Sequence, residues 1–166
     1  MQQDASQAFR EYVEQNQQAF YRLAYSYTKN PDAALDVVQE AIVKGIERIH
    51  TLKNPDYMKT WFYRVLVNEG LTYLRRNKRN LSLEECSAEE PAAEHDRTEA
   101  MDLYQSVQRL TPKLKTVVIL RFFEDMKLEE IAAVTHTNLS TVKSRLYRAL
   151  NLLRVELGEE GEHEKT

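Results

Sequence analysis

The sequence predicts an all-α protein of two small helical domains joined by an acidic linker. Only four glycines and four prolines occur in 166 residues, which favours helices over a turn-rich β fold. Apolar residues recur at spacings of three and four along most of the chain, as on the packed face of a helix. Residues 81–103 lack that spacing and carry eight acidic side chains against one basic. We therefore expect domains at residues 1–80 and 104–157, a linker at 81–103 and a flexible tail at 158–166.

The composition, 42% apolar and 30% charged, is typical of a soluble globular protein and not of a disordered chain. No apolar run approaches the roughly 18 residues that span a bilayer. The polar start "MQQDASQAFREY" does not resemble a signal peptide. A single cysteine, Cys86, cannot form an internal disulfide. These features favour a cytoplasmic protein in which Cys86 is a bystander rather than a redox sensor.

In the first domain the pattern predicts helices over residues 7–28, 33–50 and 58–79. Pro31 interrupts the chain after the first helix, and Asp32 is expected to cap the second. The second helix has an apolar stripe at spacings of 3, 4, 4 and 3, formed by Leu35, Val38, Ile42, Ile46 and Ile49. The third helix is expected to pack through Met58, Phe62, Val65, Leu66 and Tyr73, and to present Trp61, Arg64, Asn68, Thr72, Arg75 and Arg79 on another face.

The second domain begins with a helix near residues 102–110. Thr111 then caps a helix with Pro112 at its first position, and the run "VVIL" continues the helical period through Phe122 as a buried helix. A short helix packs through Leu128, Ile131, Ala132 and Val134. The following turn lacks glycine, and Asn138 can adopt the left-handed conformation in its place. Ser140 caps the last helix, whose packed stripe is Val142, Leu146, Ala149, Leu150 and Leu153.

The last two helices have the layout of a helix-turn-helix, a motif that places its second helix in the major groove of DNA. The N-terminal half of that second helix carries hydrogen-bond donors on one face, at Lys143, Ser144, Tyr147 and Arg148, flanked by Ser140, Thr141 and Arg145. Arginine and lysine can reach guanine acceptors, and serine and threonine can meet bases or phosphates. DNA binding is therefore favoured over the alternative, a helical hairpin with a solvated basic face.

Charge is segregated along the chain although the net charge is only −3. Residues 44–79 carry nine basic and three acidic side chains, and residues 107–154 carry nine basic and four acidic. The acidic linker separates these two blocks. A near-neutral total can hide two surfaces that face nucleic acid when charge is distributed in this way.

Two long segments together indicate a family. "DAALDVVQEAIVKGIERI" followed by "MKTWFYRVLVNEGLTYLRRNKR" resembles region 2 of bacterial sigma factors of the extracytoplasmic-function group. "LTPKLKTVVILRFFEDMKLEEIAAVTHTNLSTVKSRLYRALNLLR" resembles region 4 of the same proteins. The resemblance covers roughly residues 19–80 and 105–156, in the family's order. It implies an alternative sigma factor that directs RNA polymerase to promoters, in a stress or envelope response.

The resemblance also implies a role for each surface. Core RNA polymerase would contact the protein through the clamp of its largest subunit and the flap of the second largest, with Asp36, Gln39 and Glu40 at the positions that dock on the clamp. The opened strand of the −10 promoter element would meet Lys53, Asn54, Tyr57, Lys59, Trp61, Arg64, Asn68, Arg75, Arg76, Lys78 and Arg79. Duplex DNA at the −35 element would meet Ser140, Thr141, Lys143, Ser144, Arg145, Tyr147 and Arg148. An anti-sigma factor, which can be membrane-bound, would hold the protein inactive.

The sequence departs from the family at a few positions, among them Thr72, where an aspartate is usual and where a change could alter the −10 preference. A stand-alone helix-turn-helix repressor is the alternative function, but it gives the "DVVQE" helix no role. A helical adaptor without nucleic acid is less favoured because of the two basic blocks. The four histidines lack metal-ligand spacing and no glycine-rich phosphate loop occurs. We therefore expect no enzyme activity, metal, cofactor or small-molecule substrate.

Overall fold

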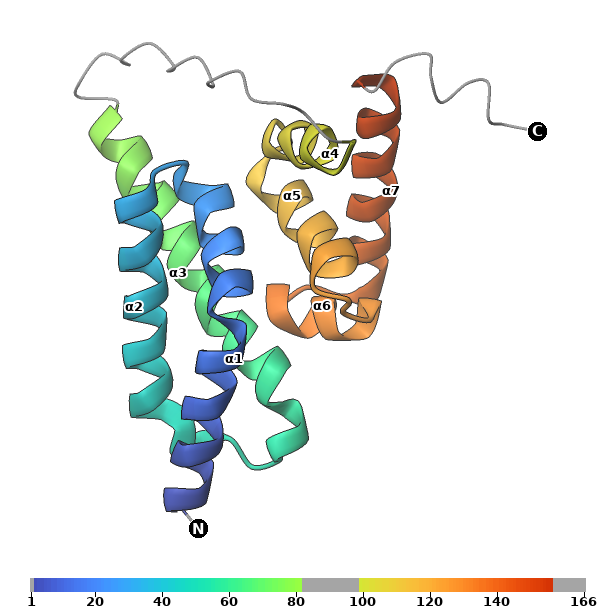
Figure 1. Ribbon diagram of the computed structural model, residues 1–166. Helices are drawn as coiled ribbons and strands as arrows, with labels where there is room; N and C mark the ends of the chain where they lie inside the picture. The colour runs from blue at the N-terminus through green and yellow to red at the C-terminus, as the bar shows by residue number, and fades with distance from the viewer. Residues whose placement is uncertain (1, 82–98, 157–166) are drawn as a thin grey trace.

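The computed structural model of the chain describes residues 2–81 and 99–156, and every regular element in those ranges is a helix. The first bundle contains α1 (Gln2–Thr28), α2 (Pro31–Arg48) and α3 (Met58–Leu81), with the short 3-10 turns η1 (Ile49–Thr51) and η2 (Pro55–Tyr57) between the last two. The second contains α4 (Glu99–Gln108), α5 (Pro112–Val118), the π-helical turn η3 (Ile119–Phe123), α6 (Leu128–Thr135) and α7 (Leu139–Glu156). Figure 1 shows the two bundles side by side, which confirms the predicted fold class.

Most of the predicted linker, with Cys86, and the predicted tail lie outside the described residues. Among the helices that the structure does describe, none has the length and apolar character needed to cross a membrane.

The first helix is longer than its apolar pattern suggested, because α1 begins at Gln2 rather than near residue 7. It is bent at Asn16, whose backbone leaves the helical region (φ −122°, ψ 16°). The Asn16 side chain donates a 2.8 Å hydrogen bond to the carbonyl of Tyr12, which partly offsets the disrupted helical bonding. Past the bend, Phe20 is fully buried and its ring lies 4.8 Å from that of Phe62 in α3.

The predicted cap of the second helix is wrong by two residues. The N-cap is Asn30, whose side-chain oxygen accepts a 2.9 Å hydrogen bond from the backbone N–H of Ala33. Pro31 occupies the first helical position, where its missing N–H leaves no partner unsatisfied. Asp32 lies inside the first turn and does not cap the helix. Its carboxylate there interacts favourably with the positive end of the helix dipole.

The predicted apolar stripe of α2 is also wrong in part. Val38 and Ile49 are buried, but Leu35 is 49% exposed and Ile46 is 61% exposed. The face that packs against α1 and α3 holds smaller residues, namely Ala34, Val37, Val38, Ala41 and Gly45. The helices approach so closely that a Cβ built on Gly45 would lie 2.5 Å from Cζ of Phe9. Close packing through small residues therefore leaves Leu35 and Ile46 in solvent.

The packed face of α3 agrees with the sequence pattern. Met58, Phe62, Val65 and Leu66 are buried, and Tyr73 is half-buried at the rim. Gly70 allows the ring of Tyr27 to approach, because a Cβ there would lie 2.2 Å from Cδ2 of that ring. The backbone of α3 is thereby held tightly against α1.

In the second bundle Thr111 is the N-cap of α5, with Pro112 at the first helical position, as predicted. The "VVIL" run is helical and buried, which is also as predicted. The helical period fails at Phe122, which is 54% exposed. The π-helical turn η3 widens the backbone there, so the following side chains rotate away from the direction that a regular helix would give them.

The turn of the helix-turn-helix and the cap of its second helix differ from the prediction. His136, not Asn138, adopts the left-handed conformation (φ 57°, ψ 43°) at the end of α6. Asn138 instead caps α7, since its side-chain oxygen accepts a 2.8 Å hydrogen bond from the backbone N–H of Thr141. Ser140 consequently lies inside α7, which begins at Leu139. Val142, Ala149 and Leu153 form the buried stripe, whereas the predicted Leu150 is exposed.

Candidate nucleic-acid and polymerase interfaces

The predicted −35 surface belongs to α7, which lies on the side of the second bundle away from the first bundle (Figure 1). Lys143, Ser144, Tyr147 and Arg148 are all exposed, and Tyr147 has 71% of its surface free. Ser140 is exposed beside them, and Thr141 and Arg145 are half-buried at the edge. The buried stripe on the opposite side packs α7 onto α5 and α6. The fold thus holds two cations, a hydroxyl and an aromatic ring on one rigid face that can enter a major groove.

A cavity of about 330 Å³ opens beside the loop that precedes α3. Its lining residues are Thr51, Leu52, Lys53, Asn54, Tyr57 and Trp61. Tyr57 is 48% exposed, while Trp61 is half-buried and packs edge-to-face against Phe9 at 5.8 Å between ring centroids. Two aromatic rings and one cation at a pocket of this size suit a single unstacked base and its phosphate.

Asn54 holds this loop in shape. Its side-chain oxygen accepts a 3.0 Å hydrogen bond from the backbone N–H of Asp56, which caps η2. Pro55 follows at the first position of that turn, so the loop is fixed by local sequence. Leu52, which sequence reasoning did not single out, supplies an apolar wall, and no periodic signal in a loop could have identified it.

The other predicted −10 residues follow α3 but separate into two groups. Asn68, Arg76 and Lys78 are exposed, and Arg75 is exposed with a 3.1 Å hydrogen bond to the hydroxyl of Thr72. The side chain of Arg79 lies outside the described part of the helix. Lys59 and Arg64 form the second group, because their side chains reach the second bundle. Lys59 donates to the carbonyl of Glu124 at 2.6 Å, and Arg64 contacts Nδ1 of His136 at 3.2 Å.

The predicted polymerase contact lies on the solvent side of α2. Asp36, Gln39 and Glu40 are all exposed there. Leu35, Val43 and Ile46 are exposed on the same helix, with 47–61% of their surfaces free. Leu35 and Ile46 were missed as site residues because their helical spacing was interpreted as a core stripe, whereas Val43 lies outside that stripe, on the side of Asp36, Gln39 and Glu40. Together the six side chains form a mixed acidic and apolar face, which is typical of a protein-binding surface.

Both bundles of the chain match known proteins. Residues 12–80 match the family described as Sigma-70 region 2, and residues 100–153 match Sigma-70, region 4. The sigma factor SigV of Bacillus subtilis (strain 168) is 44% identical over 149 residues, covering 89% of this chain and 90% of SigV. The ECF sigma factor SigW of the same organism is 25% identical, covering 90% of this chain and 89% of SigW.

The solved structure of the sigma factor RpoE from Bartonella quintana, in complex with the anti-sigma factor NepR, has the same fold. It superposes with a TM-score of 0.77 at 24% identity, covering 90% of this chain and 96% of RpoE.

The bundles, the helix-turn-helix and these matches define a bacterial transcription initiation factor. The chain belongs to the sigma-70 family of RNA polymerase sigma factors, in its extracytoplasmic-function group. It binds core RNA polymerase and directs it to promoter DNA. This family works in transcription initiation and is not a family of enzymes. The repressor interpretation is set aside, because the region 2 match accounts for the first bundle.

Proposed function

We propose that three surfaces of this sigma factor divide the work of promoter recognition. The exposed face of α7 reads the −35 element, the cavity beside Tyr57 together with α3 binds the opened −10 strand, and the solvent face of α2 docks on the polymerase clamp. Region 4 also contacts the flap of the second largest polymerase subunit. The observation that carries the proposal is the convergence of Lys143, Tyr147 and Arg148 on one exposed helical face.

The −35 assignment is tested with Lys143→Ala and Arg148→Ala. Each should weaken binding to duplex promoter DNA by about 1–3 kcal/mol if the side chain makes a bidentate contact with a base. Arg154→Ala is the matched control, because Arg154 is an exposed cation near the other end of the same helix. Equal losses in all three variants would mean that α7 contributes only general electrostatic attraction.

The −10 assignment is tested with Tyr57→Ala and Tyr57→Phe in the reconstituted holoenzyme. A ring that stacks on an unpaired base contributes about 1–3 kcal/mol, and phenylalanine retains that ring. Promoter opening, measured by permanganate reactivity of unpaired thymines, should therefore fall in Tyr57→Ala and persist in Tyr57→Phe. Normal opening in Tyr57→Ala would remove Tyr57 from the site.

The polymerase assignment is tested with Asp36→Ala and Gln39→Ala. Both should reduce affinity for core polymerase and lower transcription from every promoter alike, because the contact precedes sequence recognition. Glu11→Ala removes an exposed carboxylate from α1 and serves as the control. A loss confined to some promoters would contradict a role in docking.

Family membership supports three further parts of the proposal. The protein acts in the cytoplasm, the polymerase performs all of the chemistry, and an anti-sigma factor holds the protein inactive until a stress or envelope signal arrives. A polypeptide that copurifies with the chain and blocks reconstituted transcription would identify that partner. Variants of that polypeptide that no longer bind the chain should fail to inhibit transcription. The activity of the free sigma factor should stay unchanged.

A further inference from the structure

The third helix carries a single carboxylate among several cations. The sequence of α3 contains six lysines and arginines but only one acidic residue, Glu69. Glu69 directly follows the exposed Asn68, and the exposed Arg76 lies two helical turns farther along the same edge of the helix. At a rise of about 1.5 Å per residue, those two turns correspond to about 10 Å. Glu69 therefore borders the surface proposed to bind the −10 strand, where a negative charge repels DNA phosphates.

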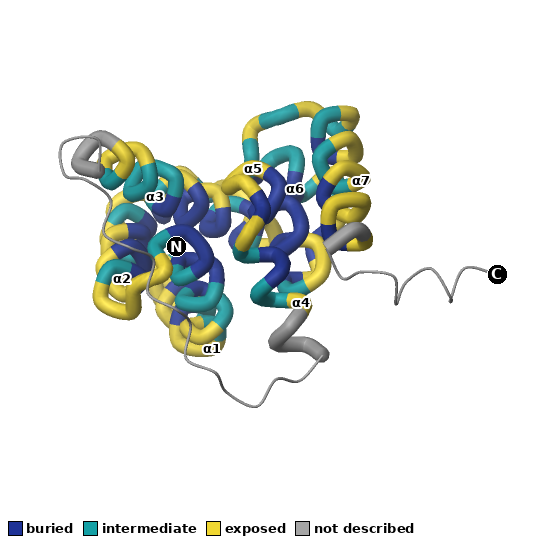
Figure 2. Tube along the Cα trace, turned by 90° about the horizontal axis from the view of Figure 1, so that it is seen from above, coloured by how far each residue is buried: buried dark blue, intermediate teal, exposed yellow. Residues whose placement is uncertain are grey.

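Lys44 is the corresponding exception on α2. The first charged residues of this helix, Asp32, Asp36 and Glu40, are all acidic. Lys44 follows Glu40 by one helical turn. Figure 2 shows α2 beside α3, with exposed positions on the outer side of α2. Lys44 thus borders the face proposed to dock on the polymerase clamp. A clamp surface that complements Asp36 and Glu40 is basic, and the Lys44 ammonium would repel it.

The structure pairs these two exceptions with each other. The ammonium of Lys44 donates to Oε1 of Glu69, which forms an ion pair between α2 and α3. The Glu69 side chain is 11% exposed and the Lys44 side chain 35% exposed. An ion pair has no net charge, so the attraction of a third charge to one member largely cancels its repulsion by the other. Each residue has the wrong charge for the surface that it borders, and the pairing removes both charges.

We propose that Lys44 and Glu69 are a masking pair, which keeps a carboxylate from repelling the −10 strand and an ammonium from repelling the polymerase clamp. Neither side chain has to touch DNA or polymerase, because each acts through the other. A purely structural ion pair would instead do no more than hold α2 against α3. This inference rests on the proposed roles of α2 and α3 in polymerase docking and strand binding.

The size of the effect follows from Coulomb's law. A unit charge about 10 Å from a phosphate changes the affinity about twofold in bulk water, and by more at the lower effective dielectric constant of a protein surface. Salt screens such charges over about 10 Å at about 0.1 M ionic strength. Loss of the mask should therefore cost about twofold or more in affinity at low salt. The loss should shrink at high salt, which a packing defect would not do.

The first variant exposes the carboxylate on α3. Lys44→Gln should weaken binding of the holoenzyme to the non-template strand of a mapped −10 element about twofold or more. Fluorescence anisotropy of the labelled strand gives this affinity. The affinity for core polymerase should stay unchanged or rise. Arg48→Gln is the matched control, because it removes an exposed cation from α2 one turn beyond Lys44.

The second variant exposes the ammonium on α2 and should have the opposite selectivity. Glu69→Gln should weaken binding to core polymerase about twofold or more, measured by competition with a labelled wild-type chain. Strand binding by the assembled holoenzyme should stay unchanged or become tighter. Glu11→Gln is the control, because it removes an exposed carboxylate from α1.

Combining Lys44→Gln with Glu69→Gln separates masking from a purely structural role. Both charges are then absent, so both affinities should return to the wild-type values. A structural ion pair predicts that each single variant weakens both affinities and that the double variant restores neither. That result would overturn the mask, as would effects no larger than those of Arg48→Gln and Glu11→Gln. A selective loss in one single variant alone would overturn the mask on the other surface.

Two further variants separate failure of the mask from failure of the proposed surfaces. Arg75→Ala removes an exposed cation of the −10 surface, and Asp36→Ala removes an exposed carboxylate of the docking face. If these variants weaken strand binding and polymerase binding respectively, while the Lys44 and Glu69 variants do not, only the mask is wrong. If Arg75→Ala and Asp36→Ala change neither affinity, the proposed surfaces themselves are wrong.

Discussion

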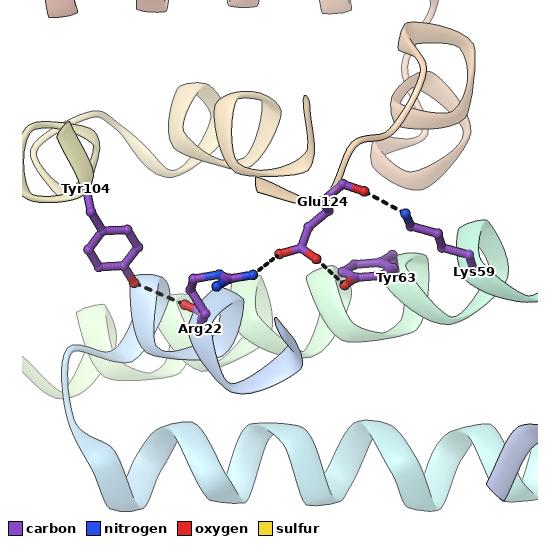
Figure 3. Close-up of polar contacts among 5 residues, drawn as sticks. All are labelled: Arg22, Lys59, Tyr63, Tyr104 and Glu124. Carbon is purple, nitrogen blue, oxygen red and sulfur yellow. Dashed lines mark hydrogen bonds and ion pairs between the residues drawn. The ribbon is translucent and has the colours of Figure 1, made fainter. Parts of the chain in front are cut away.

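The hydroxyl of Tyr63 donates a 2.7 Å hydrogen bond to the carboxylate of Glu124, which lies 61 residues later in the chain and in the other bundle. Both residues are buried. Burial and the neighbouring carboxylate raise the pKa of Tyr63, so its hydroxyl keeps its proton and acts as the donor. A buried carboxylate without partners is strongly unfavourable. Both donors described for the Glu124 side chain, Tyr63 and Arg22, belong to the first bundle (Figure 3), so this buried carboxylate of the second bundle depends on the first bundle for its hydrogen bonds.

Removing this donor should destabilise the folded chain. Tyr63→Phe leaves Oε1 of Glu124 without the hydroxyl, and a hydrogen bond to a charged group contributes about 1.5–3 kcal/mol. Urea unfolding, followed by the fluorescence of the single tryptophan Trp61, should show a loss of that size. Tyr147→Phe removes an exposed hydroxyl and should change the free energy of unfolding by less than about 0.5 kcal/mol. Equal stability of the two variants would mean that the bond is absent in solution.

The buried Lys115 should make stability depend on pH in the alkaline range. Desolvation, followed by the nearby Lys29, lowers the pKa of Lys115 from its ordinary value of 10.5 to about 8. Between about pH 8 and 10.5 the unfolded chain therefore binds more protons at this site than the folded chain does. The free energy of unfolding should rise with pH across that window, by at most about 1.4 kcal/mol per pH unit.

Lys115→Met isolates this contribution, because it removes the titrating group and keeps a long apolar side chain. The difference in unfolding free energy, wild type minus variant, should increase from pH 8 to pH 10 and stay level between pH 6 and pH 7. Tyrosines that titrate in the same range affect both proteins and largely cancel. A difference that falls as pH rises would show that Lys115 is stabilised in its charged form by the carbonyls of Ser26 and Gln108.

The elements that sequence predicted best are those in which large apolar residues alone decide the packing. Met58, Phe62 and Leu66 recur at helical spacing without a competing small-residue face, and they are buried as expected. In α2 the same reasoning failed, because Ala41 and Gly45 permit close approach and displace Ile46 into solvent. The spacing of residues identifies both faces of such a helix. It does not show which face is buried, because that depends on the elements that pack against the helix.

The parts of the candidate site that are formed by residues close together in the sequence were predictable. The exposed face of α7 and the loop at Tyr57 follow from helix spacing and turn residues within a few positions of each other. The contacts of Glu124 with the first bundle were not predictable, because Glu124 lies beside the exposed Asp125 and nothing in that acidic pair distinguishes the buried member. Its partners lie on α1 and α3, and only the tertiary structure brings them together.

At two glycines, close helix packing and intrinsic helix propensity predict opposite effects of alanine on stability. In a solvent-exposed helix, glycine to alanine stabilises by up to about 1 kcal/mol. At Gly45 the added Cβ would instead lie 2.5 Å from Phe9, and at Gly70 2.2 Å from Tyr27. Overpacking of this kind costs about 1–3 kcal/mol, so Gly45→Ala and Gly70→Ala should both lower the urea midpoint. Glu47→Ala, at an exposed position of α2, should leave it nearly unchanged. A rise in midpoint for either glycine variant would mean that the helices pack less closely than the structure indicates.

Asn138 and Ser140 both lie near the start of α7, and their alanine variants should differ in stability. Asn138 accepts a hydrogen bond from the backbone N–H of Thr141, so Asn138→Ala should lower the free energy of unfolding by about 0.5–2 kcal/mol. Ser140 lies within the helix and is exposed, so Ser140→Ala should be neutral or slightly stabilising, because alanine is the stronger helix former. Urea unfolding of both variants, followed by circular dichroism, decides between the positions. The reverse order of stabilities would move the start of α7 to Ser140, and with it the orientation of Lys143, Tyr147 and Arg148 toward DNA.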